Sequence, residues 1–341
     1  MTKGSVARRL QSGGFIVGAL LCMPAAFAQT TSVPAAKSAP ATELAAITVT
    51  GTQPGPGLWK VSKGDHVLWI LGSLSPLPKG MAWQSHDVDA AIAESQEVLG
   101  SPYVAVDVGF FKSLSVLPSL IGVRNNPDHA TLQQEVPVDV YARWLPLKAR
   151  YLGNGPAVEK RRPAIAASEL YDAAIKQAGL TDSSLVNKAV TKAAKQHGLK
   201  LTAVIYKLPL DSPRAFIKDF KQSPMQDAAC LDQTLTLVDT SLDTMKARAN
   251  AWAIGDVDAL RKLPLVDLDV CGLQHIAPEL LHKYHWTDME ERIEATWLKA
   301  AETALASNKV SFATLPIGQL TRPDGYLAKL QAQGYHVEQP E

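Results

Sequence analysis

Two serines in this chain stand where an α/β protein could use them for chemistry. Ser73 and Ser75 lie in the segment GSLSP (residues 72–76), directly after an apolar run at residues 67–71. A strand-end serine can be a nucleophile when it lies in a G-x-S-x-G turn and a histidine acts as its base. The segment does not contain that pattern, and no histidine can be assigned to either serine. Hydrogen bonding to a polar ligand is therefore the favoured interpretation.

A second polar segment lies near the carboxyl end of the chain. Gln319 and Arg322 follow the apolar run at residues 309–315. An amide offers both donors and acceptors, and a guanidinium can bind an anion. Arg322 can also be read as a solvated loop residue.

Metal chemistry has weaker candidates. His282 and His285 have the spacing to share a helical face, and His275 is close by in sequence. Histidines near helix ends are common without any metal, so we interpret these as surface residues. Asp267 and Asp269 alternate with apolar residues, which favours a partly buried strand or loop. The sequence contains neither a phosphate-binding loop of the Walker type nor a G-x-G-x-x-G dinucleotide motif.

The elements that position these residues are predicted to form an α/β fold. Residues 58–62 and 67–71 read as two strands, and Gly64 allows the tight turn at residues 63–66. The second strand is apolar without alternation, as in a strand covered on both faces. A polar loop after such a strand is the usual place for a site in an open α/β sheet.

The rest of the chain is predicted to complete a mixed central sheet from an amino-terminal and a carboxyl-terminal βα half, flanked by helices. Between residues 109 and 153 we expect short helices over the sheet. Further strands are predicted at residues 97–99, 104–108, 199–205, 309–315 and 335–338. Helices are predicted from Asp87 to Ser95, at residues 163–178, from Ser183 or Ser184 to His197, at 226–253, from a capping box of Thr287 and Glu290 to Leu305, and at 323–333.

These features carry a family resemblance. The opening LWKVS with a strand ending in LGSLS, and the ending LPIGQLTRPDGYLAKLQAQGYHVE, resemble the TraB/GumN family, related to the Tiki-type metalloproteases. The resemblance covers residues 58–337. In the family a Gly-x-x-His motif ends each of two strands, and the histidines and a carboxylate hold a divalent metal. In this chain Ser75 and Gln319 take the two histidine positions, and the acidic position falls near Ser101. Glu97 and Asp107 are the nearest carboxylates.

The resemblance therefore implies a degenerate metal site. We expect a non-catalytic binding or scaffold module without a cofactor. Its cleft would take an unknown peptide or glycan ligand and would be lined by Ser73, Ser75, Ser101, Gln319 and Arg322. The alternative is a peptidase-like hydrolase that binds a divalent cation such as manganese or cobalt through divergent ligands.

The chain ends and composition suggest where the protein acts. Residues 1–28 combine basic residues, a short apolar run and an A-x-A site, as in a signal peptide cleaved after Ala28. Residues 29–53 read as a flexible tether rich in Ala, Thr and Pro, and 54–341 as a single domain. We expect a periplasmic or secreted protein with no stable membrane span after cleavage. A formal net charge of +1 argues against nucleic acid as a partner.

Export changes the interpretation of the cysteines. Cys22 would leave with the signal peptide, so that Cys230 and Cys271 remain. Two cysteines in an oxidising compartment most simply form one disulfide, although a reactive thiol is the alternative.

Overall fold

The computed structural model describes residues 55–83, 86–107, 117–222, 227–264 and 278–340. All of these residues belong to one compact unit, Gly51–Glu341. Its organising feature is the hairpin of β1 (Leu58–Lys63) and β2 (His66–Ser73), paired from Leu58↔Leu71 to Lys63↔His66. Gly64 in the turn has φ +62°, which only glycine adopts without strain. The predicted hairpin is confirmed.

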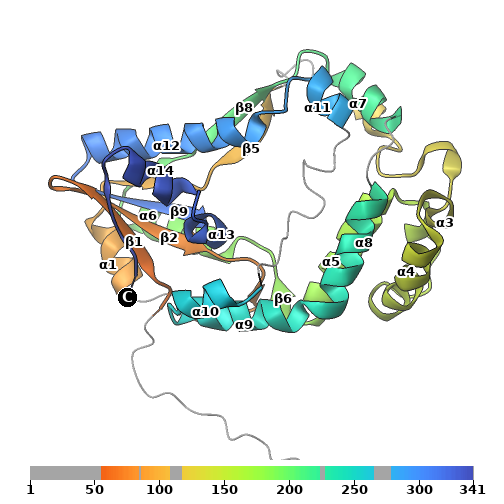
Figure 1. Cartoon of the computed structure of the whole chain (residues 1–341), viewed down its shortest axis with the longest axis horizontal. Helices are drawn as coiled ribbons and strands as arrows, with labels where there is room; N and C mark the ends of the chain where they lie inside the picture. The colour runs from red at the N-terminus through yellow and green to blue at the C-terminus, as the bar shows by residue number, and fades with distance from the viewer. Residues whose placement is uncertain (1–54, 84–85, 108–116, 223–226, 265–277, 341) are drawn as a thin grey trace, which may run out of the picture. The chain divides into compact units, whose positions relative to one another are not determined.

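The central sheet has six strands in the order β10-β1-β2-β9-β4-β7 (Figure 1). Strands β2, β9 (Val310–Pro316), β4 (Glu97–Leu99) and β7 (Lys200–Thr202) are parallel. Strand β1 is antiparallel to β2 and to β10 (His336–Glu338). The two ends of the domain therefore supply neighbouring central strands, and the predicted mixed α/β architecture is confirmed.

Helices cover both faces of this sheet. The crossover from β2 to β4 places α1 (His86–Glu94) on one face, and the return from β7 to β9 places α12 (Met289–Ser307) on the opposite face (Figure 1). Figure 1 shows these two helices on opposite sides of the strands. Leu68, Ile70 and Phe312 are fully buried between the helices, which explains why the central strands are continuously apolar.

One of the predicted strands does not extend the central sheet, and another is shorter than predicted. β5 (Tyr103–Asp107) pairs instead with β8 (Ile205–Pro209) in a separate two-stranded sheet. The single strand predicted at residues 199–205 was therefore wrong, because the chain leaves the central sheet after Thr202 and starts a new pairing at Ile205. β3 (Leu77–Pro78) and β6 (Leu180–Thr181) form a third small sheet.

The long helix predicted at residues 226–253 is two helices, α8 (Asp227–Thr240) and α9 (Leu242–Ala253). Their apolar residues belong to different clusters: Leu231 and Leu235 pack with α4 and α5, whereas Trp252 packs with the central sheet. One straight helix could not bury both faces, so the chain breaks at Ser241. The apolar spacing of three and four continues across the break and does not reveal it.

The predicted helices between residues 109 and 153 also differ in their packing. The longest in the described part of that segment, α4 (Val138–Tyr151), packs on α5 (Pro163–Gln177) and α8 and not on the sheet. This helical cluster has its own core around Trp144 and Leu170.

The remaining elements are mostly short. Helix α6 (Leu185–Gln196) begins after Ser184, one of the two predicted starting residues, whose side chain makes no capping hydrogen bond. Helix α12 begins at Met289 after Asp288 and has no side-chain cap, so the predicted capping box was wrong. The other described helices are α3 (Leu132–Glu135), α7 (Pro213–Gln222), α10 (Val257–Lys262), α11 (Pro278–Lys283), α13 (Ile317–Thr321), α14 (Tyr326–Ala332), and the 3₁₀ turns η1 (Leu117–Leu120), η2 (Pro127–His129) and η3 (Val158–Lys160).

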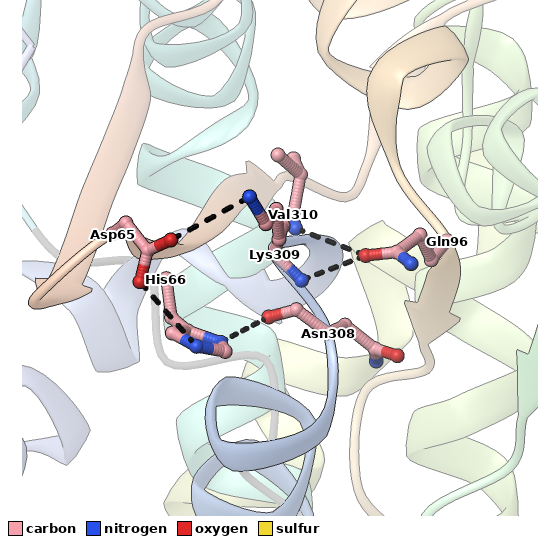
Figure 2. Close-up of polar contacts among 6 residues, drawn as sticks. All are labelled: Asp65, His66, Gln96, Asn308, Lys309 and Val310. Atoms are coloured by element: carbon pink, nitrogen blue, oxygen red, sulfur yellow. Dashed lines mark hydrogen bonds and ion pairs between the residues drawn. The ribbon is translucent and has the colours of Figure 1, made fainter.

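Polar side chains join the central strands at their amino ends (Figure 2). His66 Nδ1 lies 2.6 Å from the carbonyl oxygen of Asn308, just before β9. Gln96, just before β4, accepts a hydrogen bond of 2.7 Å from the backbone N–H of Lys309. Lys309 also reaches Asp65 of the hairpin turn at 3.6 Å. These contacts fix the relative positions of three parallel strands at the end of the sheet away from the candidate site.

Candidate functional site

The strongest candidate site lies at the carboxyl ends of β2 and β9. The chain leaves β2 toward α1 on one face and leaves β9 toward α13 and α14, of which α14 packs with α12 of the other face. Neighbouring strands whose connections diverge in this way leave a crevice, which is the usual ligand site of open α/β sheets. A cavity of about 320 Å³ lies here. Its described lining is Ser73, Leu74, Ser75, Pro76, Asp182, Ser184, Val186, Asn187, Met245, Arg248, Pro316, Ile317 and Gly318.

The two predicted serines both line this cavity. Ser73 ends β2, and its hydroxyl donates to the carbonyl oxygen of Leu315 at 3.2 Å. Trp252 fixes the same strand end from α9, because its buried Nε1–H donates to the carbonyl oxygen of Gly72 at 2.6 Å. The position of the serines is therefore set by the neighbouring strand and by α9.

A side chain at Gly72 would crowd the close packing of α13 on the end of β2. A Cβ atom at this position would lie 2.4 Å from Cδ1 of Ile317 and 3.2 Å from the ring of Trp59. We expect Gly72→Ala to lower the free energy of unfolding by about 1–3 kcal/mol, because the added methyl overpacks a buried contact. Chemical denaturation measures the change.

Gly318 provides the matched control, since a Cβ atom there meets no heavy atom within 4 Å. In the helix α13 we expect Gly318→Ala to be neutral or to stabilise by up to about 1 kcal/mol. Equal stability of the Gly72→Ala variant and the unaltered protein would contradict this account of the strand end.

Arg248 is the buried charged group of the cavity. It lies on α9 with only 5% of its surface exposed. Its Nη1 donates to the carbonyl oxygens of Leu260, Leu263 and Pro264 at 3.0, 3.2 and 3.3 Å. Burial lowers the pKa of the Arg248 guanidinium. The sequence analysis missed this residue, which stands within a helical pattern and carries no motif of its own.

The start of α6 supplies the remaining polar groups. Asn187 lines the cavity, and its Oδ1 is buried and accepts no hydrogen bond from the described residues. Asp182 and Ser184 are exposed at the same place. A polar ligand could therefore meet a hydroxyl, an amide and a guanidinium within one cavity.

Ser101 lies in a different place from the other predicted residues. It follows β4, donates to the carbonyl oxygen of Thr314 at 3.0 Å, and lines a second cavity of about 460 Å³. Asn187 lines both cavities, so they are neighbours. The structure thus assigns Ser73 and Ser75 to one cavity and Ser101 to the next.

Gln319 and Arg322 were predicted to line the cleft from a loop, but the chain after β9 forms the helix α13. Gln319 lies within that helix and is not among the described lining residues, which include its neighbour Gly318. Arg322 is exposed and pairs with Asp324 at 3.1 Å. The early helix after β9 therefore replaces the expected polar loop.

The donor set around the cavity does not suit a divalent cation. Hydroxyl, amide and guanidinium groups dominate it, and Asp182 is the carboxylate among its described lining residues. Across the described ranges no group of three or more His, Cys, Asp or Glu side chains could hold a metal ion. Zinc and similar ions are bound by imidazole, thiolate and carboxylate ligands, so we derive no catalytic step through a metal.

Glu97, the nearest predicted carboxylate, is engaged at the other end of the sheet. It begins β4 and is buried, where it pairs with Lys200 at 2.8 Å and accepts a hydrogen bond of 2.9 Å from Asn308. Burial opposes its ionisation, but the hydrogen bonds from Lys200, Thr202 and Asn308 lower the pKa of Glu97.

Of the other candidates, Asp267, Asp269, His275 and Cys271 lie outside the described residues, as do the predicted signal peptide and tether. Cys230 is buried in α8.

The fold and the cavity define an α/β protein with a cavity at the switch point of its parallel strands, where open α/β sheets usually bind ligands. The model of the TraB/PrgY/gumN family matches residues 57–339, and the chain belongs to this family. Comparisons with curated proteins and with solved structures gave no significant match. Among the described residues, no helix is both long and apolar enough to cross a membrane.

Proposed function

We propose that this protein is a non-catalytic binding module whose cavity at the ends of β2 and β9 takes a small polar fragment of a peptide or glycan. The observation that carries the proposal is the composition of the cavity wall. Ser73, Ser75, Asn187 and Arg248 offer hydrogen bonds. By the family resemblance, Ser75 and Gln319 take the positions of the two metal histidines. Such groups bind neutral or anionic ligands well and divalent cations poorly.

A metal-binding experiment separates this function from that of a divalent-metal hydrolase with divergent ligands. Purified protein is incubated with manganese or cobalt, freed of unbound ion by gel filtration, and measured by elemental analysis. We expect far less than one ion per chain, because two imidazoles are replaced by a hydroxyl and an amide. Retention of one ion per chain, removable by a chelator, would overturn the proposal.

Ligand binding can be tested directly by blocking the cavity. Short peptides and oligosaccharides are titrated into ¹⁵N-labelled protein, and chemical-shift changes are followed by NMR. We expect Gly318→Phe to abolish the changes, because Gly318 lines the cavity and has open space beside it. Gly155→Phe is the matched control, since Gly155 also has open space but lies elsewhere. Equal responses from both variants would place the ligand outside this cavity.

The proposal includes export to the periplasm or the exterior, on the evidence of the amino-terminal sequence. An oxidising compartment would permit a disulfide between Cys230 and Cys271. Thiol labelling under denaturing conditions, with and without prior reduction, tests the pairing. Two reactive thiols before reduction would contradict it.

A further inference from the structure

We propose that the ligand of this cavity carries a carboxylate next to an aliphatic group, and that Arg248 binds the carboxylate. This inference rests on the proposed binding function and names the chemical class of its ligand. It concerns the cavity at the ends of β2 and β9 and a residue that no sequence motif identifies.

The first step is the hydrogen bonding of the guanidinium. A guanidinium carries five N–H donors in a fixed plane. The bonds of Arg248 to Leu260, Leu263 and Pro264 all come from Nη1. Nε and Nη2 have no hydrogen-bond partner among the described residues. Neither nitrogen is fully buried. These two donors therefore keep some accessible surface, and Arg248 is one of the residues that line the cavity.

The second step is the charge. Arg248 forms no ion pair with any described carboxylate, although only 5% of its surface is exposed. A buried cation is costly unless an anion and hydrogen bonds compensate it. Carbonyl oxygens compensate Nη1 alone. A carboxylate that accepts from Nε and Nη2 together would complete the pair in the bidentate geometry that guanidinium groups favour.

The third step is the rest of the wall. Leu74, Val186, Met245 and Ile317 give the cavity an aliphatic side, and no aromatic residue is among its described lining. An aliphatic chain fits this wall by apolar burial. Asp182 is the other charged lining residue, and it is exposed. It would disfavour a second negative charge, which points to a monocarboxylate.

Matched ligand pairs test the inference on the unaltered full-length protein. Calorimetric titration compares 4-methylpentanoate with 4-methylpentanamide, N-acetylleucine with N-acetylleucinamide, and glucuronate with glucose. We expect each aliphatic carboxylate to bind at least about tenfold more tightly than its neutral partner, and glucuronate to bind worse than either. 4-Methylpentanoate represents a free carboxylic acid, and N-acetylleucine represents the carboxyl end of a peptide. The tighter binder of the two therefore identifies which kind of carboxylate the cavity takes.

Two variants locate the effect. Arg248→Met should remove the preference for the carboxylate, and Arg248→Lys should weaken it, because lysine keeps the charge without the planar fork. Lys246→Met on the same helix is the control, as the side chain of Lys246 is 45% exposed and pairs with Asp243. Because Arg248 also holds three carbonyls, each variant is first checked for an unchanged NMR spectrum outside the cavity. If Arg248→Met fails that check, the salt dependence of carboxylate binding to the unaltered protein replaces it, and a salt-independent affinity overturns the assignment.

The outcomes separate this inference from the function on which it rests. Equal affinity for acid and amide would overturn the inference and leave the binding function intact. Absence of binding by every carboxylate overturns the inference as well, whereas the binding function is judged by the peptide and oligosaccharide titrations with Gly318→Phe. Retention of a metal ion would overturn the binding function itself.

Discussion

A chain that ends at Asn308 is expected to show no cooperative unfolding transition. Such a chain lacks β9, which lies between β2 and β4 and pairs with both. It also lacks Phe312, which is fully buried in the main core. Without β9 the amino-terminal hairpin loses its connection to the other parallel strands, so no alternative pairing can restore the sheet. Thermal unfolding followed by circular dichroism measures the effect.

A chain that ends at Gly334 is the matched control. It keeps β9, α13 and α14 and loses only the edge strand β10, whose pairing with β1 spans three residues. We expect this shorter protein to unfold cooperatively at a lower temperature. A cooperative transition in the chain that ends at Asn308 would show that the amino-terminal part folds alone, contrary to the expectation.

A smaller change at the same strand gives a measurable energy. We expect Phe312→Ala to lower the free energy of unfolding by about 3–5 kcal/mol, because it leaves a cavity in a closely packed core. Denaturant titration gives the value. A loss below about 1 kcal/mol would mean that this part of the core is loosely packed.

Asp227→Ala is expected to destabilise the helical cluster of α4, α5 and α8 by about 3–5 kcal/mol. Asp227 accepts a hydrogen bond of 2.9 Å from Nε of Arg162, and both side chains are 7% exposed. Nη1 of Arg162 also donates to the carbonyl oxygen of Phe220 at 3.2 Å, and the guanidinium lies over the Phe220 ring. Removing the carboxylate takes a hydrogen-bonded anion away from this buried cation. Denaturant titration again measures the loss.

The control for this prediction is Asp232→Ala on the same helix. Asp232 pairs with Arg143, but both side chains are 44% exposed, so water screens the pair. We expect a loss below about 1 kcal/mol. Similar losses for Asp227→Ala and Asp232→Ala would contradict the distinction between a buried and an exposed ion pair. Arg162→Met with Asp227→Leu should recover much of the stability, because the pair is then replaced by apolar contacts.

Local pattern was sufficient to predict the central elements. The hairpin, the strand at the carboxyl end and the helix that begins at Pro163 depend on apolar runs, a turn glycine and a proline at a helix start, which act over a few residues. The apolar spacing was insufficient where tertiary packing breaks one predicted helix into two. The apolar spacing across Ser241 suits one helix, but α8 and α9 bury their faces in different cores.

The sequence by itself determined the α/β class, the two serines that border the cavity, and the family to which the chain belongs. Only the tertiary structure decided which groups share one cavity. It separated Ser101 from Ser73 and Ser75, placed Gln319 inside a helix, and brought in Arg248 from a helix far along the chain. The physical reason is that residue type and spacing report on local conformation, whereas a site depends on which distant segments pack together around the ends of the central strands.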